Sequence, residues 1–308
     1  MNILAELPQQ FVNGLAQGSI YALIALGYTM VYGVLRFINF AHGDIYMLGA
    51  YGGFFAAGWF GLSNIRSGET ANLPRVALVF IVSMLLCALA GAIMERLAYR
   101  PLRNSPRLTA LITAIGISML LEYGGQAVFT PDPQPFPTLL PDLLLVNQPN
   151  FTLSLVQVVI VIVALVLMLA LQFTVLKTRL GRAMRAVSLD RGAASLMGIN
   201  TDVIIAFTFA LGSALAAAAG ILNSIYTPTI NPLMGLMAGL KAFVAAVLGG
   251  IGSIPGAMLG GLLMGFAETA VVAAGYSQYR DAIAFAILIL VLLLRPAGLL
   301  GRAAAEKV

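Results

Sequence analysis

Residues 177–200 read Lys-Thr-Arg-Leu-Gly-Arg-Ala-Met-Arg-Ala-Val-Ser-Leu-Asp-Arg-Gly-Ala-Ala-Ser-Leu-Met-Gly-Ile-Asn and separate two long apolar runs. The segment carries five cationic side chains and one acidic side chain: Lys177, Arg179, Arg182, Arg185, Arg191 and the acid Asp190. Because short loops rich in Lys and Arg stay on the cytoplasmic side of a membrane, we expect this segment to be cytoplasmic. Its charge and its small residues indicate an attachment surface for a partner rather than a passive linker.

The composition of the chain indicates a polytopic membrane protein. Of its 308 residues, 60% are hydrophobic and 9% are charged, and its mean hydropathy is +0.95. A soluble domain carries about a quarter charged residues, so this deficit indicates lipid as the solvent. We therefore predict an all-α membrane protein in which residues 1–308 form a single transmembrane domain. The lone Cys87 excludes an intramolecular disulfide.

Apolar runs long enough for about 20 residues of helix predict nine membrane spans. The expected spans are residues 10–35, 41–62, 74–94, 108–129, 152–176, 203–223, 234–250, 255–274 and 278–295. The first of them is expected to serve as an uncleaved anchor, because no cationic segment of a secretory signal precedes it. An eight-span alternative merges two of the last three helices.

The distribution of charge sets the expected orientation. Basic side chains gather in the connection at 95–107, in the 177–200 segment and near the C-terminus. Outside the 177–200 segment these cations are Arg96, Arg100, Arg103, Arg107, Arg295, Arg302 and Lys307. These segments are separated by even numbers of predicted spans, whereas residues 130–150 hold two Asp and no cation. We expect the cations in the cytoplasm, residues 130–150 and the N-terminus outside, and the C-terminus inside. Cations confined to loops argue against a nucleic-acid partner despite the net charge of +5.

Two glycine-containing polar clusters predict breaks in the helices, at residues 39–44 and 249–255. Non-helical backbone at membrane depth needs surrounding protein or a water-filled cavity, and transporters place such breaks near the substrate path. The alternative is an ordinary tight turn at the membrane surface. Candidate translocation-path residues are therefore the polar members of these clusters together with one buried cation: Asn39, His42, Asp44, Ser253 and Lys241.

Other ionisable residues within the apolar runs are Arg36, Glu122 and Glu268. Each is costly in lipid, so each is expected to face protein, a cavity or the membrane interface. For Arg36 and Glu122 the simpler interpretation is a position near a helix end, with the charge reaching the headgroups. Lys241 is open to both interpretations.

The sequence favours a transporter over an enzyme. It contains one His, no paired-histidine metal motif, no second intramembrane Asp for an aspartyl dyad and no phosphate-binding loop. We therefore predict no catalytic residues and no metal site. If transport is active, its energy comes either from an ion gradient or from a separate ATPase that docks on the basic segment.

Several stretches carry a family resemblance. In the basic segment, Ala194 is followed four residues later by Gly198, as in the EAA-type coupling loops of ABC importer permeases, although Gly192 stands where an acid is usual. Further matching stretches are Gly27–Gly33, Ile38–Gly49, Ala98–Arg103, Met197–Asp202 and Gly239–Ala257. Together they resemble, over nearly the whole chain, the permeases of high-affinity branched-chain amino acid importers, the LIV system.

The resemblance implies a Type II-like ABC importer fold in a bacterial inner membrane. It also implies a second homologous permease subunit, two ATPase subunits that bind ATP and magnesium, and a periplasmic binding protein that delivers leucine, isoleucine or valine. No cofactor is then expected in this chain itself. The expected ATPase-coupling residues are Arg179, Gly181, Arg182, Arg185, Asp190, Ala193, Ala194 and Gly198.

One alternative from another mechanistic class stays open. His42, Asp44 and Glu268 could serve an ion-coupled secondary transporter or a channel for a small polar solute. Related permeases also carry other amino acids, amides or urea, and no single residue identifies the solute.

Overall fold

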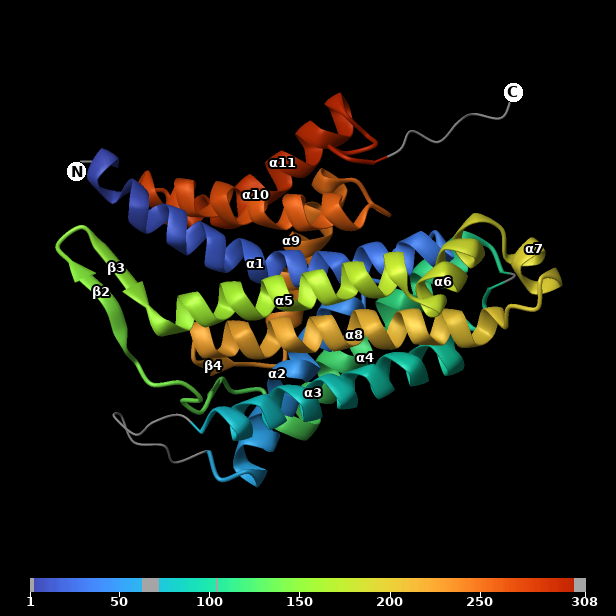
Figure 1. Ribbon diagram of the computed structural model, residues 1–308, viewed down its shortest axis with the longest axis horizontal. Coiled ribbons are helices and arrows are strands. Elements are labelled where there is room, and N and C mark those ends of the chain that lie inside the picture. Colours follow the sequence, from blue (N-terminus) through green and yellow to red (C-terminus); the bar gives the residue numbers. More distant parts are fainter. Residues whose placement is uncertain (1–2, 63–71, 104, 302–308) are drawn as a thin grey trace.

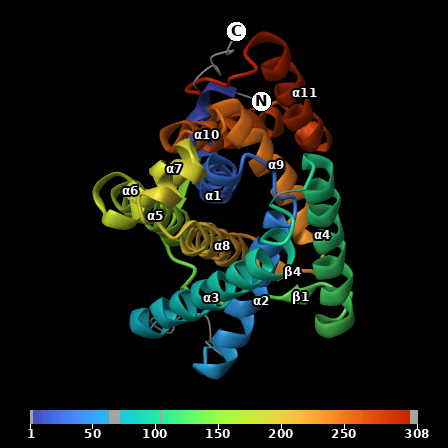
Figure 2. The same ribbon diagram turned by 90° about the vertical axis from the view of Figure 1, so that its right-hand side faces the viewer.

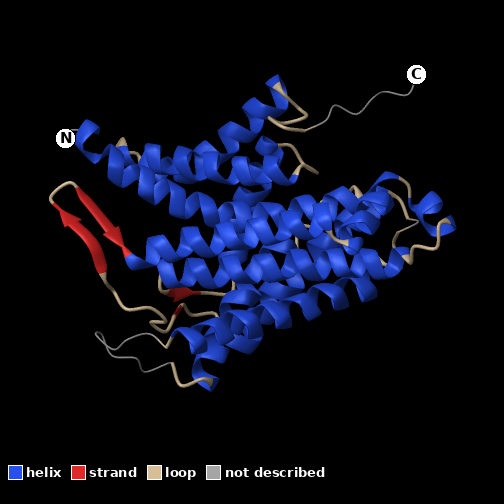
Figure 3. Ribbon diagram, viewed as in Figure 1, coloured by secondary structure: helices blue, strands red, loops and turns tan. Residues whose placement is uncertain are grey.

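The long helices of the chain run roughly side by side, and short strands gather at one end of the bundle (Figures 1 and 3). The structure is a computed structural model that describes residues 3–62, 72–103 and 105–301. The helices of the first half are α1 (Ile3–Leu35), α2 (His42–Trp59), α3 (Leu73–Met94), the π-helical turn η1 (Glu95–Tyr99), α4 (Arg107–Phe129) and α5 (Leu155–Lys177). Those of the second half are α6 (Arg179–Leu189), α7 (Arg191–Leu196), α8 (Thr201–Tyr226), α9 (Met234–Gly249), α10 (Ile254–Ala273), the 3₁₀ turn η2 (Ser277–Tyr279) and α11 (Arg280–Leu294).

A helix occupies each of the nine predicted spans. Within the described residues, seven segments are long and apolar enough to cross a membrane; they contain α1, α3, α4, α5, α8, α10 and α11. The other two predicted spans correspond to helices α2 and α9, of 18 and 16 residues. The structure therefore confirms a polytopic helical membrane protein. The cations Arg302 and Lys307 lie outside the described residues.

Helices α1 and α8 form the centre of the bundle. Viewed along the bundle, α1 lies among α5, α8, α9 and α10, while α3 and α4 lie at the periphery (Figure 2). The side chains of α1 are almost all buried from Gly14 to Leu35, whereas few of those on α4 and α11 are buried. Since a membrane helix packs closely on its neighbours through small residues, the glycines and alanines of α1 and α8 explain their central position.

The crossing of α1 and α10 shows how little space separates the central helices. A Cβ atom on Gly18 would lie 2.8 Å from the Cα atom of Leu262, and one on Gly261 would overlap the backbone of Ala22. Only residues without a side chain permit this approach of two backbones. The glycines of the two helices therefore fix their relative position.

Four short strands lie at the end of the bundle away from α6 and α7. Strand β1 (Gln134–Pro135) pairs antiparallel with β4 (Thr229–Ile230), and β2 (Leu144–Gln148) pairs antiparallel with β3 (Phe151–Ser154). Sequence analysis expected only a loop at 130–150, so the hairpin of β2 and β3 is a new feature. Helix α5 begins at residue 155 rather than 152, because Ser154 and Gln157 form a reciprocal capping box that fixes its start.

The two predicted breaks have different structures. Residues 249–255 form a turn between α9 and α10, in which Gly250 and Gly252 have φ angles of +103° and +95° and Ser253 caps α10. Gly252 is exposed, so this cluster is a tight turn between antiparallel helices. Residues 36–41, in contrast, form a connector that includes the buried Asn39 and Ala41 and enters the protein before α2 begins. The non-helical backbone of this connector is therefore surrounded by protein, as the first of the two interpretations requires.

Candidate functional site

The basic segment forms two short helices that project from one end of the bundle (Figure 1). Helix α6 is amphipathic: Gly181, Met184 and Val187 are buried, while Arg179, Arg182 and Arg185 are exposed. Thr178 caps the helix, its hydroxyl accepting a hydrogen bond of 3.1 Å from the Gly181 amide. Helix α6 precedes a second short helix, α7, which contains Ala193 and Ala194.

Two of the expected coupling residues on α6 hold the helix in place. A Cβ on Gly181 would overlap the carbonyls of Thr174 and Val175, so only glycine fits where α6 folds back on α5. The guanidinium of Arg185 donates a hydrogen bond to the Val175 carbonyl at the end of α5. Arg185 is thus a positioning residue, whereas Arg179 and Arg182 have charges available for a partner.

Helix α7 presents its apolar residues to solvent. Leu196 and Met197 are 90% and 83% exposed, and Leu189 at the end of α6 is 82% exposed. Ala194 is buried against the bundle, while Ala193 is exposed. A cluster of exposed large apolar residues is the usual mark of a protein-protein contact. We call Leu189, Leu196 and Met197 the apolar tip.

The two ends of α7 are fixed by local chemistry. The Asp190 carboxylate accepts a hydrogen bond of 3.0 Å from the Ala193 amide and so caps the start of the helix. Gly198 has a φ of +81°, and the amide of the following residue bonds back to the Ala194 carbonyl. This left-handed glycine ends the helix. The sequence interval between Ala194 and Gly198 therefore corresponds to the last turn and the stop of α7.

Two arginines join this segment to the end of α1. Arg191 donates a hydrogen bond of 3.0 Å to the Val34 carbonyl, and Arg36 lies 3.5 Å from the Ser188 carbonyl. The last carbonyls of a helix favour a cation. Burial lowers the pKa of Arg191, and the neighbouring guanidiniums of Arg103 and Arg36 lower it further. Arg36 thus has a structural contact at the junction, in addition to its position near a helix end.

A network of ion pairs fastens the start of α8, which follows the basic segment, to η1 and the turn after it. Arg103 bridges Glu95, at the start of the π-helical turn, and Asp202, in the first turn of α8; Arg100 pairs with Asp202 as well. Glu95 is 2% exposed and Arg103 is 13% exposed at the side chain. Sequence analysis did not select these residues for a role. The sequence nevertheless pointed to these residues. Two of the stretches that carry the family resemblance, Ala98–Arg103 and Met197–Asp202, are joined by these ion pairs.

The connector at 36–41 leads from this junction into the middle of the protein. The Tyr99 hydroxyl donates a hydrogen bond to the Asn39 side chain, and both residues are buried. His42, the first residue of α2, lies against Gly27 of α1, where a Cβ would overlap the imidazole. A Cβ on Gly43 would lie 2.9 Å from the Cα of Gly239, so the starts of α2 and α9 meet closely.

Asp44 and Glu122 lie near one another between α2 and α4. The Ser118 hydroxyl on α4 donates a hydrogen bond to the Asp44 carboxylate. Asp44 is 1% exposed and Glu122 is 8% exposed. Glu122 therefore faces protein, which differs from the simpler expectation of a position near a helix end.

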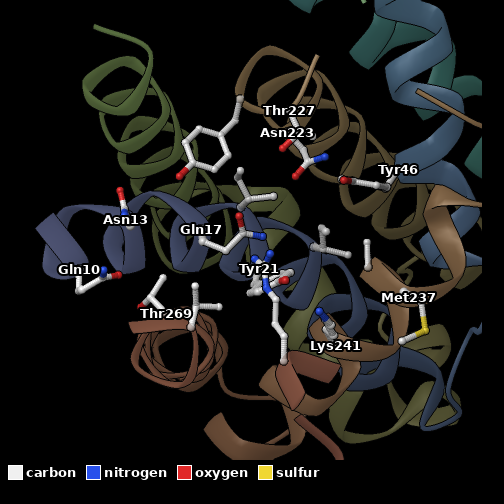
Figure 4. Close-up of a pocket in the computed structure, with 16 residues that line it drawn as sticks. Gln10, Asn13, Gln17, Tyr21, Tyr46, Asn223, Thr227, Met237, Lys241 and Thr269 are labelled. Carbon is white, nitrogen blue, oxygen red and sulfur yellow. The ribbon is translucent and has the colours of Figure 1, made fainter. Parts of the chain in front are cut away.

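A cavity of about 300 Å³ lies between α1, α2, α8, α9, α10 and the start of α11, towards the end of the bundle that carries the strands (Figure 4). Its polar lining includes Asn13, Gln17, Tyr46, Asn223 and Lys241. Of the five candidate path residues, Lys241 is the one that lines this cavity. Ser253 lies at the start of α10, away from it, and Asn39, His42 and Asp44 belong to the connector and α2.

Lys241 belongs to a cluster of charges beside this cavity. The Glu268 carboxylate is wholly buried; Oε1 lies 2.9 Å from the Lys241 ammonium and Oε2 lies 2.7 Å from Nε of Arg280. The Tyr21 hydroxyl donates a further bond of 2.9 Å to Oε2, and Asp281 lies 2.6 Å from the Lys241 nitrogen. A buried carboxylate needs such partners in order to stay ionised. Lys241 thus neutralises Glu268 and does not reach lipid headgroups.

Comparison with known proteins identifies the family. The family described as "Branched-chain amino acid transport system / permease component" matches residues 10–292. The chain belongs to this permease family. This permease is 48% identical over 303 residues to the high-affinity branched-chain amino acid transport system permease protein LivH of Salmonella typhimurium, and 46% identical over 303 residues to BraD, the permease protein of the system of the same name in Pseudomonas aeruginosa. Both alignments cover 97% of this chain and 97% of the relative.

A more distant relative of this permease bears a different substrate in its name. The ribose import permease protein RbsC of Haemophilus influenzae is 28% identical over 290 residues, which is 92% of this chain and 83% of the relative. No solved structure matches this permease. The sequence similarity therefore extends to a permease that is named for a sugar.

Proposed function

We propose that this permease is the membrane subunit of an ABC importer that moves the branched-chain amino acids leucine, isoleucine and valine across a bacterial inner membrane. It works with a second homologous permease and with two ATPase subunits that bind ATP and magnesium. A periplasmic binding protein delivers the amino acid. The identity to LivH and BraD over 97% of the chain supports the substrate class.

The projecting α6–α7 segment carries the proposal. Its apolar tip is formed by Leu189, Leu196 and Met197, all more than four-fifths exposed, and it lies beside the exposed cations Arg179 and Arg182. An exposed apolar cluster rimmed by charge fits a groove in a partner protein. ATP-dependent motion of that partner reaches the bundle through the bond from Arg191 to the end of α1 and through the ion pairs of Arg103 with η1 and α8.

This function sets the orientation of the bundle. The α6–α7 end, with its Arg and Lys side chains, lies in the cytoplasm, and the end with the strands faces the binding protein. Helix α1 then begins outside and α11 ends inside. No catalytic residue or metal is required in this chain, since ATP is hydrolysed by the partner subunits.

Reconstitution tests the proposal against an ion-coupled carrier. Proteoliposomes with the full complex should accumulate labelled leucine only with ATP and binding protein, whereas this chain alone with a proton or sodium gradient should not. Uptake driven by the gradient alone would refute the ABC mechanism. The charges favour the ABC mechanism, because Glu268 already has Lys241 and Arg280 as counter-ions and is not a free cation site.

Charge reversal tests the coupling segment itself. Arg182→Glu should abolish uptake and the ATPase activity stimulated by the binding protein while membrane insertion persists, because Arg182 is exposed on α6. Arg185→Glu should have the same effect and also loosen α6, since Arg185 bonds to the Val175 carbonyl. Undiminished stimulated ATPase activity in both variants would contradict a coupling role.

A further inference from the structure

The charged groups around the 300 Å³ cavity are arranged asymmetrically. The two cations Lys241 and Arg280 line the cavity, whereas the carboxylates that neutralise them, Glu268 and Asp281, do not. Glu268 is wholly buried behind Lys241. The two cations therefore line the space and the two carboxylates do not, which favours a ligand with an anionic end.

Both cations retain hydrogen-bonding capacity. An ammonium has three donors, and Lys241 directs two of them at Glu268 and Asp281. A guanidinium has five N–H donors, and within the described residues Arg280 donates one hydrogen bond, through Nε to Glu268. The planar Nη groups of an arginine match the two oxygens of a carboxylate. A carboxylate in the cavity could thus bind Arg280 and Lys241 together.

The rest of the lining suits the remaining parts of a small zwitterion. Gln17 on α1, Tyr46 on α2 and Asn223 on α8 surround one space and bring oxygen atoms that can accept bonds from an ammonium (Figure 4). Apolar side chains complete the lining: Ile20, Ile24, Met237, Ala238 and Val272. The volume is at the lower end of the range for ligand sites, which is about 300–1,000 Å³, and fits a small solute.

We propose that this cavity binds a free aliphatic α-amino acid during transport. The carboxylate binds Lys241 and Arg280, the ammonium binds the oxygens of Gln17, Tyr46 and Asn223, and the side chain lies against the apolar residues. This inference rests on the proposed function and adds the site to it. Lys241 then has two roles, as counter-ion of Glu268 and as ligand of the substrate carboxylate.

A paired substitution separates these two roles. The single variant Lys241→Gln leaves the buried Glu268 with one counter-ion fewer. A loss of uptake in this variant would therefore not show which of the two roles of Lys241 had been lost. The double variant Lys241→Gln with Glu268→Gln removes both charges and leaves Arg280 and its sequence neighbour Asp281 as the remaining opposite charges. If Lys241 serves only as a counter-ion, the double variant should transport like the wild type. If Lys241 binds substrate, uptake by the double variant should stay about tenfold or more below that of the wild type, as expected for a lost charge-assisted bond. The charge-conserving variant Lys241→Arg should then retain more uptake than the double variant.

Photocrosslinking locates the ligand in the wild-type protein. The full complex in lipid nanodiscs is illuminated with a diazirine analogue of leucine while the binding protein delivers it, and labelled peptides are mapped by mass spectrometry. We expect label on the residues of the cavity, displaced by leucine but not by leucinamide delivered at the same occupancy of the binding protein, because the amide lacks the carboxylate. Arg75→Gln, which removes an exposed cation at the start of α3, is the control and should label and transport normally.

The outcomes separate this inference from the proposed function. Label elsewhere in the permease, or wild-type uptake by the double variant, overturns the cavity site while branched-chain transport stands. If the complex carries a different α-amino acid, the substrate assignment fails and the cavity is tested with that amino acid. A complex that carries no α-amino acid overturns both.

Discussion

Replacing the apolar tip should separate the permease from its ATPase without unfolding it. Leu196 and Met197 are 90% and 83% exposed, so Leu196→Ser with Met197→Ser removes almost no contact within the chain. We expect the stability of the permease to change by about 0.5 kcal/mol or less per substitution. Burial of each side chain in a partner groove would contribute about 1.5–3 kcal/mol. Loss of both therefore weakens the contact by about 3–6 kcal/mol, a factor of about 10² to 10⁴ in affinity.

The assay is copurification of the ATPase with tagged permease, together with ATP-driven leucine uptake in proteoliposomes. Both should be lost in the double variant, while its melting temperature in detergent stays that of the wild type. Leu145→Ser provides the control for copurification of the ATPase, because Leu145 is 52% exposed on the β2–β3 hairpin at the opposite end. Normal ATPase recovery and normal uptake with the tip replaced would refute the docking argument.

Three further predictions concern the backbone and the ion network. Gly198→Val should cost about 1–2 kcal/mol at the end of α7, since φ is +81° there. It should also lower the ATPase activity that the binding protein stimulates. Gly198→Asn should keep more of this activity, and equal activity in the two variants would contradict a conformational role. Gly18→Leu should lower the melting temperature markedly, because overpacking costs about 1–3 kcal/mol or more, whereas Gly116→Ala, with no atom within 4 Å of its Cβ, should leave it unchanged or raise it. Arg103→Gln should destabilise the permease by about 3–5 kcal/mol by leaving the buried Glu95 without its cation; adding Glu95→Gln should restore most of the thermal stability, and a failure to do so would show that the pair is not the cause.

The helices could be predicted from the sequence because lipid requires long apolar runs, and each predicted span contains one. The central position of α1 could not be read from hydropathy, since the equally apolar α4 is peripheral and exposed. What distinguishes α1 is its contact with other backbones at Gly18 and Gly27, and a single sequence does not show which glycines are in contact. The hairpin of β2 and β3 was missed because its exposed strands are short and separated by one tight turn.

The part of the candidate site formed by neighbouring charges in the sequence could be predicted. The part formed by residues that only the fold brings together could not. The basic segment stood out in sequence, whereas the capping role of Asp190 emerged only from the structure, in which its carboxylate accepts a hydrogen bond from the Ala193 amide. The partners Lys241 and Glu268 lie 27 residues apart on different helices, so their ion pair of 2.9 Å depends on how α9 packs against α10. The cavity draws its lining from six helices, which no local pattern could reveal.

Helix α1 connects the two regions described above. It is one helix of 33 residues, about 50 Å long. Its Val34 carbonyl receives the bond from Arg191, while Asn13, Gln17 and Tyr21 near its other end line the cavity. Since a helix of this kind moves as a unit, a shift of α7 and a change around the cavity are not independent. Thermodynamic linkage then requires that the coupling be reciprocal. If a solute in the cavity strengthens the binding of α7 to its partner by a given free energy, the partner strengthens the binding of the solute by the same amount.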